Sequence, residues 1–347
     1  MPASADMARA RSALARKLRD GLEQRGYLEV ETPIAVPVAG QEPHLRPFET
    51  TFTPDPPVPP GGIEGARRLH LQTSPEYAMK RLIARGGFSR CYQLARVFRD
   101  GELSQMHNPE FTLLEFYASP GSAATIMADL EQLVFACAAE APARKGPGRR
   151  GSGKISLRPP YERLTCRDAF TRYAGFDPFP LDAAAFAQAA RACGVRAAEG
   201  AGWDDLFTLV LLEKVEPALG IGRPTFLTGY PASQAALARL SPTDPGVAER
   251  FELYAAGLEL ANGWSELSDA REQRRRLEQE QRLRRELGRE VFPLDEKFLG
   301  ALEGIGDAGG VAVGFDRLLM LLTGAQSIAE VLLFPAAEEY GAARRAR

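Results

Sequence analysis

Residues 98–117 read FRDGELSQMHNPEFTLLEFY. Strand-forming residues occupy both ends of this stretch, over 91–99 and 109–118, and a polar loop containing glycine lies between them. The pattern predicts two strands joined by a loop, with Arg99 held at the rigid end of the first strand. A β-hairpin with a merely charged tip is the structural alternative.

On both sides of this hairpin, the hydrophobic periodicity predicts further helices and strands. On the N-terminal side we expect a helix over 6–25, strands over 27–33 and 69–73, and a helix that begins near residue 76. On the C-terminal side we expect helices over 122–140, 165–215, 269–287 and 316–323, and strands over 225–230, 249–264 and 311–314. Strand pairs joined by turns, with helices in blocks, indicate an α+β fold: an antiparallel β-sheet flanked by helices.

Composition excludes several classes of protein. The chain has 347 residues, a formal net charge of -2 and 45% hydrophobic residues, which is typical of a globular protein without an overall basic field for nucleic acid. Four cysteines and three histidines, with no CxxC pair, argue against a zinc site and fit a reducing cytosol. The sequence contains neither a secretory signal nor a long apolar run, so we expect a cytoplasmic protein that does not bind membranes.

We expect one catalytic domain over residues 1–335. Two surface loop insertions interrupt it, at 54–62, which is rich in proline, and at 141–160, which is rich in glycine, proline and basic residues. Residues 336–347 are expected to form a flexible C-terminal tail.

Three further segments carry candidate functional residues. Residues 310–324, GVAVGFDRLLMLLTG, predict a glycine-rich strand that runs into a helix carrying Arg317. Residues 251–270, FELYAAGLELANGWSELSDA, contain three regularly spaced glutamates, and residues 71–83, LQTSPEYAMKRLI, place Ser-Pro-Glu at a helix start. Taken alone, each segment has a structural alternative: a strand–helix junction, a charged stripe and an ordinary helix N-terminus.

Together these segments resemble the catalytic core of class II aminoacyl-tRNA synthetases, most closely that of lysyl-tRNA synthetases. Residues 98–117 are similar to motif 2 of the family, residues 310–324 to motif 3, and residues 251–270 to the ELANxxSEL stretch. Residues 26–33, GYLEVETP, are similar to motif 1, which usually builds a dimer interface and therefore implies a homodimer. The resemblance covers nearly the whole chain, about residues 8–334.

The resemblance implies that the protein forms an aminoacyl-adenylate from ATP with Mg²⁺. A substrate carboxylate attacks the α-phosphorus, pyrophosphate leaves, and the guanidinium groups of two catalytic residues, Arg99 and Arg317, stabilise the developing charge. The implied ATP-binding residues are Arg99, Asp100, Gly101, His107, Asn108, Phe111, Glu259, Leu260, Gly314 and Arg317. The implied substrate-binding residues are Ser74, Pro75, Glu76, Tyr117, Glu266 and Ala312. The implied metal ligands are Glu259 and Glu266, and Glu252 is left as a surface residue.

Two positions depart from the family pattern. Arg99-Asp100-Gly101 stands where the family usually has Arg-Asn-Glu, so the acidic contact to adenine is either shifted to Glu102 or replaced by backbone. Ala312 stands where lysyl-tRNA synthetases typically have glycine, and its methyl group would narrow the pocket near the substrate α-carbon.

Lysyl-tRNA synthetases with such a core carry an N-terminal barrel that reads the anticodon, and the few residues before residue 8 leave no room for one. In this respect the chain resembles stand-alone paralogues that ligate lysine, preferably (R)-β-lysine, to a lysine of translation elongation factor P; residues 230–240 and 247–254 add to the match. This resemblance implies elongation factor P as acceptor, lysine or (R)-β-lysine as substrate, and no stable tRNA binding. An enzyme that charges tRNA and a non-catalytic regulatory paralogue remain as alternatives.

Overall fold

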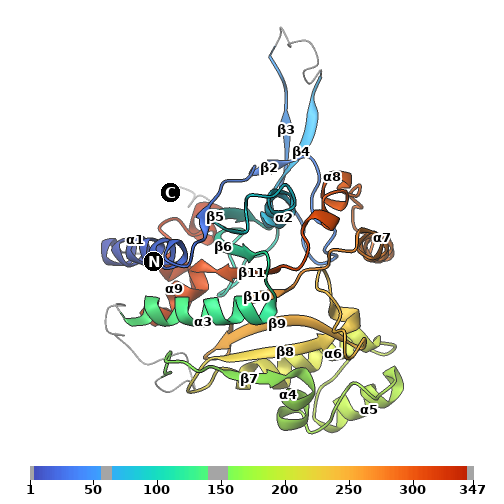
Figure 1. The fold of residues 1–347 in the computed structure, drawn as a ribbon. Helices are drawn as coiled ribbons and strands as arrows, with labels where there is room; N and C mark the ends of the chain where they lie inside the picture. Colours follow the sequence, from blue (N-terminus) through green and yellow to red (C-terminus); the bar gives the residue numbers. More distant parts are fainter. Residues whose placement is uncertain (1–3, 56–64, 140–154, 342–347) are drawn as a thin grey trace, which may run out of the picture.

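The structure, a computed structural model, describes residues 4–55, 65–139 and 155–341 (Figure 1). The helices are α1 (Ala5–Glu23), α2 (Glu76–Ala84), α3 (Ala123–Ala139), α4 (Cys166–Tyr173), α5 (Ala183–Ala192), α6 (Trp203–Val210), α7 (Ala270–Glu286), α8 (Glu296–Leu299), α9 (Phe315–Thr323) and α10 (Ala336–Glu339). The strands are β1 (Leu28–Glu29), β2 (Ala35–Val36), β3 (Glu49–Phe52), β4 (Arg67–Leu71), β5 (Arg90–Phe98), β6 (Glu110–Ala118), β7 (Glu162–Thr165), β8 (Thr225–Pro231), β9 (Val247–Ala255), β10 (Leu258–Ser265) and β11 (Gly309–Gly314).

A central sheet organises the described part of the chain. Its eight strands follow the order β1-β5-β6-β11-β10-β9-β8-β7, and β2, β4 and β3 form a separate small sheet. Neighbouring strands of the central sheet are antiparallel, except that β1 pairs with β5 and β7 with β8 in parallel. The predicted α+β fold with an antiparallel sheet is therefore confirmed, and the parallel pairs lie only at its two edges.

The two faces of the central sheet are covered by different helices, and one of them is partly open. Leucines of α1 and α3 pack with α9 and with inward residues of β6 and β11 to form the main hydrophobic core on one face. The three helices lie together beside the sheet (Figure 1). On the opposite face, α4, α5 and α6 cover the β8–β9 end, where Phe170 stacks on Phe207 at 4.8 Å between ring centroids. The rest of that opposite face, over β6, β11 and β10, is left for the cavity described below.

Strand β11 shows how the sequence separates core from cavity. Side chains alternate across a strand, and Val311 and Val313 accordingly enter the core. The glycine-rich positions point to the other face and line the cavity: Gly310, Ala312 and Gly314. In the register of the sheet, Ala312 lies opposite Glu115 of β6 and Asn262 of β10.

Three local expectations are changed by the structure. The strand expected over 27–33 is regular only at Leu28–Glu29. The flexible tail expected from residue 336 does not begin there, because α10 forms and Ala336 is buried, with its N–H donating to Asn108 Oδ1 at 2.9 Å. Residues 56–64 and 140–154, which hold most of the two expected insertions, lie outside the described residues, although Ile155 and Leu157 pack against the main core.

Within the described residues, no helix is both long enough and apolar enough to cross a membrane.

Candidate active site

A cavity of about 410 Å³ opens over β6, β11 and β10. Its wall is completed by the loop that carries Glu42 and Leu45, by the tip of the β5–β6 hairpin and by Glu280 of α7. The predicted site residues that line the cavity are Ser74, Glu76, Arg99, His107, Asn108, Phe111, Tyr117, Glu259, Leu260, Ala312, Gly314 and Arg317. The fold thus brings all four sequence segments to one place.

The tip of the β5–β6 hairpin explains the departure from the family pattern. Asp100 turns toward Arg46 and forms an ion pair with it at 2.6 Å. Gly101 has a φ of +84°, which favours glycine, and a Cβ there would lie 3.1 Å from Arg46 Nη2. Neither residue lines the cavity, whereas Glu102 does, and its buried Oε2 has no hydrogen-bond partner among the described residues. The geometry therefore favours Glu102, rather than Asp100 or Gly101, as the acid near a nucleotide.

One end of the cavity carries a guanidinium over an aromatic ring. Arg99 directly follows β5, as predicted, and its guanidinium lies 5.1 Å from the Phe111 ring centroid. Arg99 Nη1 is 3.7 Å from Glu102 Oε1, and a quarter of the Arg99 side chain (25%) is exposed. A charge that is positioned but only loosely paired can interact with an anionic ligand.

A second guanidinium enters from the first turn of α9. Arg317 donates hydrogen bonds to the backbone oxygen (3.0 Å) and the carboxylate (3.1 Å) of Glu259, and its Nη2 lies 2.8 Å from His107 Nε2. Burial and the charge of Arg317 lower the pKa of His107, which favours the neutral imidazole. A neutral His107 accepts from Arg317 while its Nδ1–H donates to Ser104 Oγ at 2.9 Å.

Glu252 is a buried residue of the site, so the expectation of a surface role is wrong. Its Oε1 accepts a hydrogen bond from Arg250 Nη2 at 2.5 Å, and its Oε2 accepts from Tyr254 OH. Burial and the charge of Glu252 raise the pKa of Glu259, although Arg317 opposes this shift. Glu259 lines the cavity, and its carboxylate is a ligand that suits an oxygen-preferring divalent cation.

Glu266 is engaged differently. Its Oε2 lies 2.6 Å from Lys80 Nζ and accepts a hydrogen bond from Trp264 Nε1 at 3.0 Å. Lys80, on α2, is 1% exposed and also lies 2.5 Å from Glu76 Oε1. An ammonium already neutralises this carboxylate, so the geometry does not support the predicted role of Glu266 as a metal ligand.

The second carboxylate oxygen of Glu266 is available to bind a ligand. Oε1 is buried without a hydrogen-bond partner among the described residues. It lies above Gly310, where an added Cβ would collide with both this oxygen and the Tyr117 ring. Only glycine at position 310 keeps this end of the cavity open, and an ammonium group is the natural partner for the free oxygen.

Glu115 adds a third carboxyl at the same end, which sequence reasoning did not identify. It is 1% exposed, and it accepts hydrogen bonds from Ser74 Oγ at 2.5 Å and Tyr117 OH at 3.0 Å. Burial and the charge of Glu76 raise the pKa of Glu115 to about 8. Burial likewise raises the pKa of Glu266 to about 7, despite the opposing charge of Lys80. This end of the cavity therefore carries more carboxyl groups than cations.

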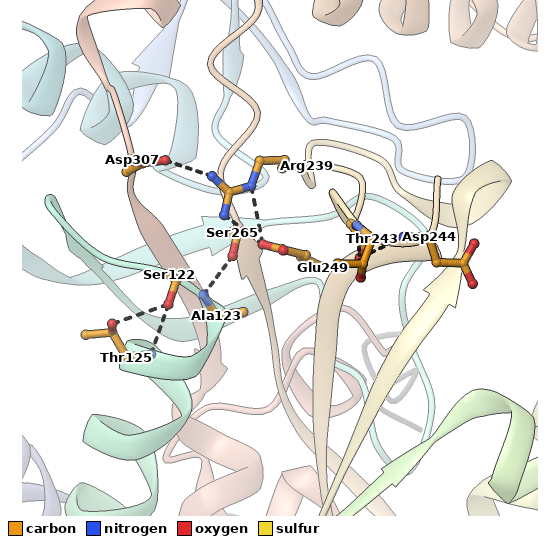
Figure 2. Close-up of polar contacts among 10 residues, drawn as sticks. Ser122, Ala123, Thr125, Arg239, Thr243, Asp244, Glu249, Ser265 and Asp307 are labelled. Carbon is orange, nitrogen blue, oxygen red and sulfur yellow. Dashed lines mark hydrogen bonds and ion pairs between the residues drawn. The ribbon is translucent and has the colours of Figure 1, made fainter. Parts of the chain in front are cut away.

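Polar contacts hold one further wall of the cavity in place (Figure 2). Arg239 forms ion pairs with Glu249 of β9 at 2.9 Å and with Asp307, just before β11, at 2.8 Å. The backbone N–H of Arg239 also donates to the carbonyl of Ser265 at 2.8 Å. These contacts fix the segment that carries Leu237, a wall residue, next to the residue that precedes Glu266.

Buried Arg284 of α7 ties down the loop that carries Glu42. Its Nη1 donates to the backbone oxygens of Glu42 (2.8 Å) and Leu45 (3.2 Å), and its Nε donates to that of Glu290 (2.5 Å). Arg284 is 2% exposed, and burial lowers its pKa. The α7 sequence, AREQRRRLEQEQRLRRE, is rich in arginine throughout, so no sequence signal singles out this one.

Comparison with known proteins agrees with this geometry. The family model described as tRNA synthetases class II (D, K and N) matches residues 1–338. The chain is 40% identical over 324 residues to the elongation factor P–(R)-β-lysine ligase of Proteus mirabilis, covering 92% of this chain and 91% of that protein. It is 41% identical over 330 residues to the protein of the same name from Klebsiella pneumoniae strain 342, covering 93% of both.

The fold and the cavity define the catalytic core of a class II aminoacyl-tRNA synthetase. Within that class, the chain belongs to the family of class II tRNA synthetases for Asp, Lys and Asn (D, K and N).

Proposed function

We propose that this protein activates (R)-β-lysine, or lysine, with ATP as an aminoacyl-adenylate and ligates it to a lysine of elongation factor P. One observation carries the proposal: the cavity has an anion-binding end and a cation-binding end. Arg99 and Arg317 line the first end, and the buried carboxyl groups of Glu76 and Glu115 line the second. Glu266 is buried behind Gly310 at the second end. A phosphorylated nucleotide and a diamine fit these two ends.

The nucleotide end supports the chemistry of activation. The adenine ring would stack on Phe111, now covered by Arg99, and Glu102 would accept a hydrogen bond from the base. The amino-acid carboxylate attacks the α-phosphorus, the bond to pyrophosphate breaks, and Arg99 stabilises the charge on the α-phosphoryl oxygens. Arg317 would bind the departing phosphates, exchanging its contact with Glu259 for a stronger one.

The metal proposal changes with the structure. Glu259 would hold Mg²⁺, because it lines the cavity and the charge of the neighbouring Glu252 raises the electrostatic cost of ionising it without a cation. When bound, Mg²⁺ neutralises phosphate charge as pyrophosphate leaves.

The amino-acid end supports a substrate with two ammonium groups. The free Oε1 of Glu266 would receive one ammonium beside Tyr117, and Glu76 would receive the other near Ser74. Lys80 holds the carboxyl groups of Glu76 and Glu266 in place. Burial alone would lower the pKa of Lys80, but the charges of Glu266 and Glu76 raise it. The acceptor in the proposal follows from the names of the relatives, which are elongation factor P–(R)-β-lysine ligases.

The proposal includes a homodimer and no stable tRNA binding. Leu28 and Ile34, in and just after the motif 1 segment, are 55% and 46% exposed, which leaves apolar surface for a second copy. The net charge of -2 gives no general attraction to a polyanion.

The test compares acceptors and amino acids directly. Purified protein is incubated with ATP, Mg²⁺ and labelled (R)-β-lysine or lysine, and with either elongation factor P or tRNA. We expect label on elongation factor P only. Label on tRNA would overturn the proposed acceptor, and absence of pyrophosphate exchange with either amino acid would overturn activation itself.

Arg99→Ala tests the role of the first guanidinium. We expect pyrophosphate exchange to fall by roughly 10²–10³-fold, since a contact that stabilises transition-state charge contributes about 3–4 kcal/mol. Arg96→Ala is the matched control, because Arg96 lies on the same strand, is 48% exposed and pairs with Glu110 away from the cavity. Near-normal exchange in Arg99→Ala would remove Arg99 from the catalytic role.

A further inference from the structure

A second cavity of about 380 Å³ adjoins the first. Four residues line both cavities: Glu42, Ser74, Glu76 and Tyr77. Because Ser74 and Glu76 belong to the amino-acid end, the second cavity meets the first at that end and not beside the nucleotide. It therefore leads toward the position where the carbonyl carbon of an aminoacyl-adenylate would lie.

The wall of the second cavity is largely aliphatic. Residues 33–40, PIAVPVAG, supply much of one side, and Leu294 contributes on the other. Such a wall fits a flexible chain of methylene groups and disfavours a charged ammonium, because the charged form loses hydration there. Charged side chains gather elsewhere on the wall: Arg81, Asp295, Glu296 and Lys297.

Glu42 lies where the two cavities meet, and one of its carboxylate oxygens makes no hydrogen bond to the described residues. Its Oε2 is buried without a hydrogen-bond partner among the described residues. The backbone of Glu42 is fixed by Arg284, so the carboxyl group is held at the junction by the fold. Burial raises the pKa of Glu42, and the charge of Glu76 adds to the shift. A carboxylate with a raised pKa is a better proton acceptor than an ordinary one.

We propose that the lysine side chain of the acceptor protein reaches the adenylate through the second cavity, and that Glu42 is the base that takes the proton of its ammonium. The inference rests on the proposed ligation. It adds an entry route and a catalytic residue for the transfer step, whereas Arg99 and Arg317 serve the activation step.

In the transfer step, the acceptor ammonium must lose a proton before its nitrogen can attack the adenylate. The acceptor ammonium gives one proton to the Glu42 carboxylate and becomes a neutral amine. The amine nitrogen attacks the carbonyl carbon of the adenylate, a C–N bond forms, and the bond from that carbon to the phosphate oxygen breaks. AMP leaves with the electron pair, and the second proton of the nitrogen departs with the AMP phosphate or to solvent.

Glu42→Gln tests the base. Wild type and variant are loaded with (R)-β-lysyl-adenylate in a single turnover, and the adenylate is then offered either elongation factor P or hydroxylamine, a small nucleophile that is uncharged at neutral pH. We expect transfer to elongation factor P to fall by about 10²-fold or more, as for loss of a general base. Hydroxamate formation should fall far less, because hydroxylamine has no proton to surrender before attack.

The pH profile distinguishes a base from a structural residue. Transfer by Glu42→Gln should rise about tenfold per pH unit above neutrality, since the free acceptor amine must come from solution, where the pKa of lysine is about 10.4. Glu42→Asp should recover part of the lost rate. A Gln variant with the same pH profile as wild type would overturn the assignment.

Val38→Trp tests the route, because Val38 lines the second cavity but not the first. His44→Trp is the matched control: it adds an indole ring at a nearby exposed position that lines neither cavity. We expect Val38→Trp to slow transfer to elongation factor P at least tenfold, with hydroxamate formation retained, and His44→Trp to change neither.

The outcomes separate the two proposals. If wild type forms the hydroxamate but never modifies elongation factor P, the proposed function fails. If wild type modifies elongation factor P and Glu42→Gln or Val38→Trp does so at the wild-type rate, the corresponding part of the inference fails while the proposed function stands. Equal loss of transfer and hydroxamate in Glu42→Gln would place Glu42 in activation and overturn its role as the transfer base.

Discussion

Ala312 lines the cavity where we propose that the size of the amino-acid substrate is set. It sits between Glu115 and Asn262 in the sheet and lines the cavity with its methyl group. A β-amino acid carries its amino group one carbon further from the carboxylate, so a methyl group at this position occupies space that an α-ammonium would use. We expect Ala312→Gly to raise kcat/KM for lysine relative to (R)-β-lysine, by roughly 10–200-fold for one methyl-sized change.

The measurement is the ratio of kcat/KM values in pyrophosphate exchange. Ala118→Gly is the control, because Ala118 lies on β6 but is buried in the main core. An unchanged ratio in Ala312→Gly, with both activities intact, would show that position 312 does not select the substrate.

Lys80 is expected to matter for both stability and binding. Lys80→Met would leave the buried carboxylates of Glu76 and Glu266 without a cation, and removing one partner of a buried ion pair costs about 3–5 kcal/mol. We expect a lower melting temperature that recovers in part when lysine is added, because a substrate ammonium can replace the lost charge. Arg85→Met, which removes an exposed cation just after the same helix, should leave the melting temperature unchanged. A Lys80→Met protein as stable as wild type would contradict this account.

Arg99 and Arg317 could be predicted from the sequence because each lies in a short, locally defined pattern. Lys80, Glu115 and Glu252 could not, since their roles depend on neighbours from other strands or helices. Lys80 did carry a weak local signal, its i,i+4 spacing from Glu76. The sequence identified Glu266 as a site residue. Its role depends on its ion pair with Lys80, which lies on α2, far away in the sequence.

At the scale of elements, α7 differs most from its sequence pattern. Its sequence is mostly Arg, Glu and Gln, which is typical of a solvated helix, yet Arg284 is buried and holds the loop that carries Glu42 and Leu45. We expect Arg284→Met to loosen that loop, lowering stability by about 1.5–3 kcal/mol for lost hydrogen bonds from a charged donor. Because Glu42 and Leu45 line the cavity, KM for the amino acid should rise.

Urea unfolding and pyrophosphate exchange measure these two effects. Arg285→Met is the matched control, since Arg285 neighbours Arg284 but is exposed. Unchanged stability and KM in Arg284→Met would show that the loop keeps its place without this arginine.

The long, periodic elements were predictable, and the short ones were not. Helices α1, α3 and α7 and strands β5, β6 and β8 lie close to their expected ranges, because each presents a continuous hydrophobic or capping pattern. β1 shortens to two residues because its pairing with β5 is limited, and α10 forms through contacts such as that of Ala336 with Asn108. Tertiary contacts of this kind leave no periodic signal.

The whole molecule should lose stability as pH rises from weakly acidic to weakly basic values. Burial raises the pKa of Glu280 to about 8, with Glu42 and Glu76 adding to the shift. An unfolded glutamate releases its proton near pH 4.3. Between these values the folded state binds more protons than the unfolded state. The contribution of Glu280 to the free energy of unfolding is therefore fully present below about pH 4.3 and is lost as pH rises through 8.

Urea unfolding at pH 5, 6, 7 and 8 checks this expectation. Glu280→Gln removes one such group, so its free energy of unfolding should fall less over this range than that of wild type, by on the order of 2 kcal/mol. Parallel pH profiles for the two proteins would show that Glu280 is ionised in the folded state at neutral pH.

The pairing of β6 with β11 has a consequence for how the protein is made. His107 and Arg317 touch across this part of the sheet although 210 residues separate them in the sequence. At about 5–20 residues per second, a ribosome needs roughly 10–40 s to extend the chain from one to the other. Throughout that interval β6 lacks β11, its neighbour in the sheet, and the cavity lacks Arg317. We therefore expect the nascent chain to be inactive until β11 and α9 emerge, and a chain stalled on the ribosome before residue 309 not to bind ATP.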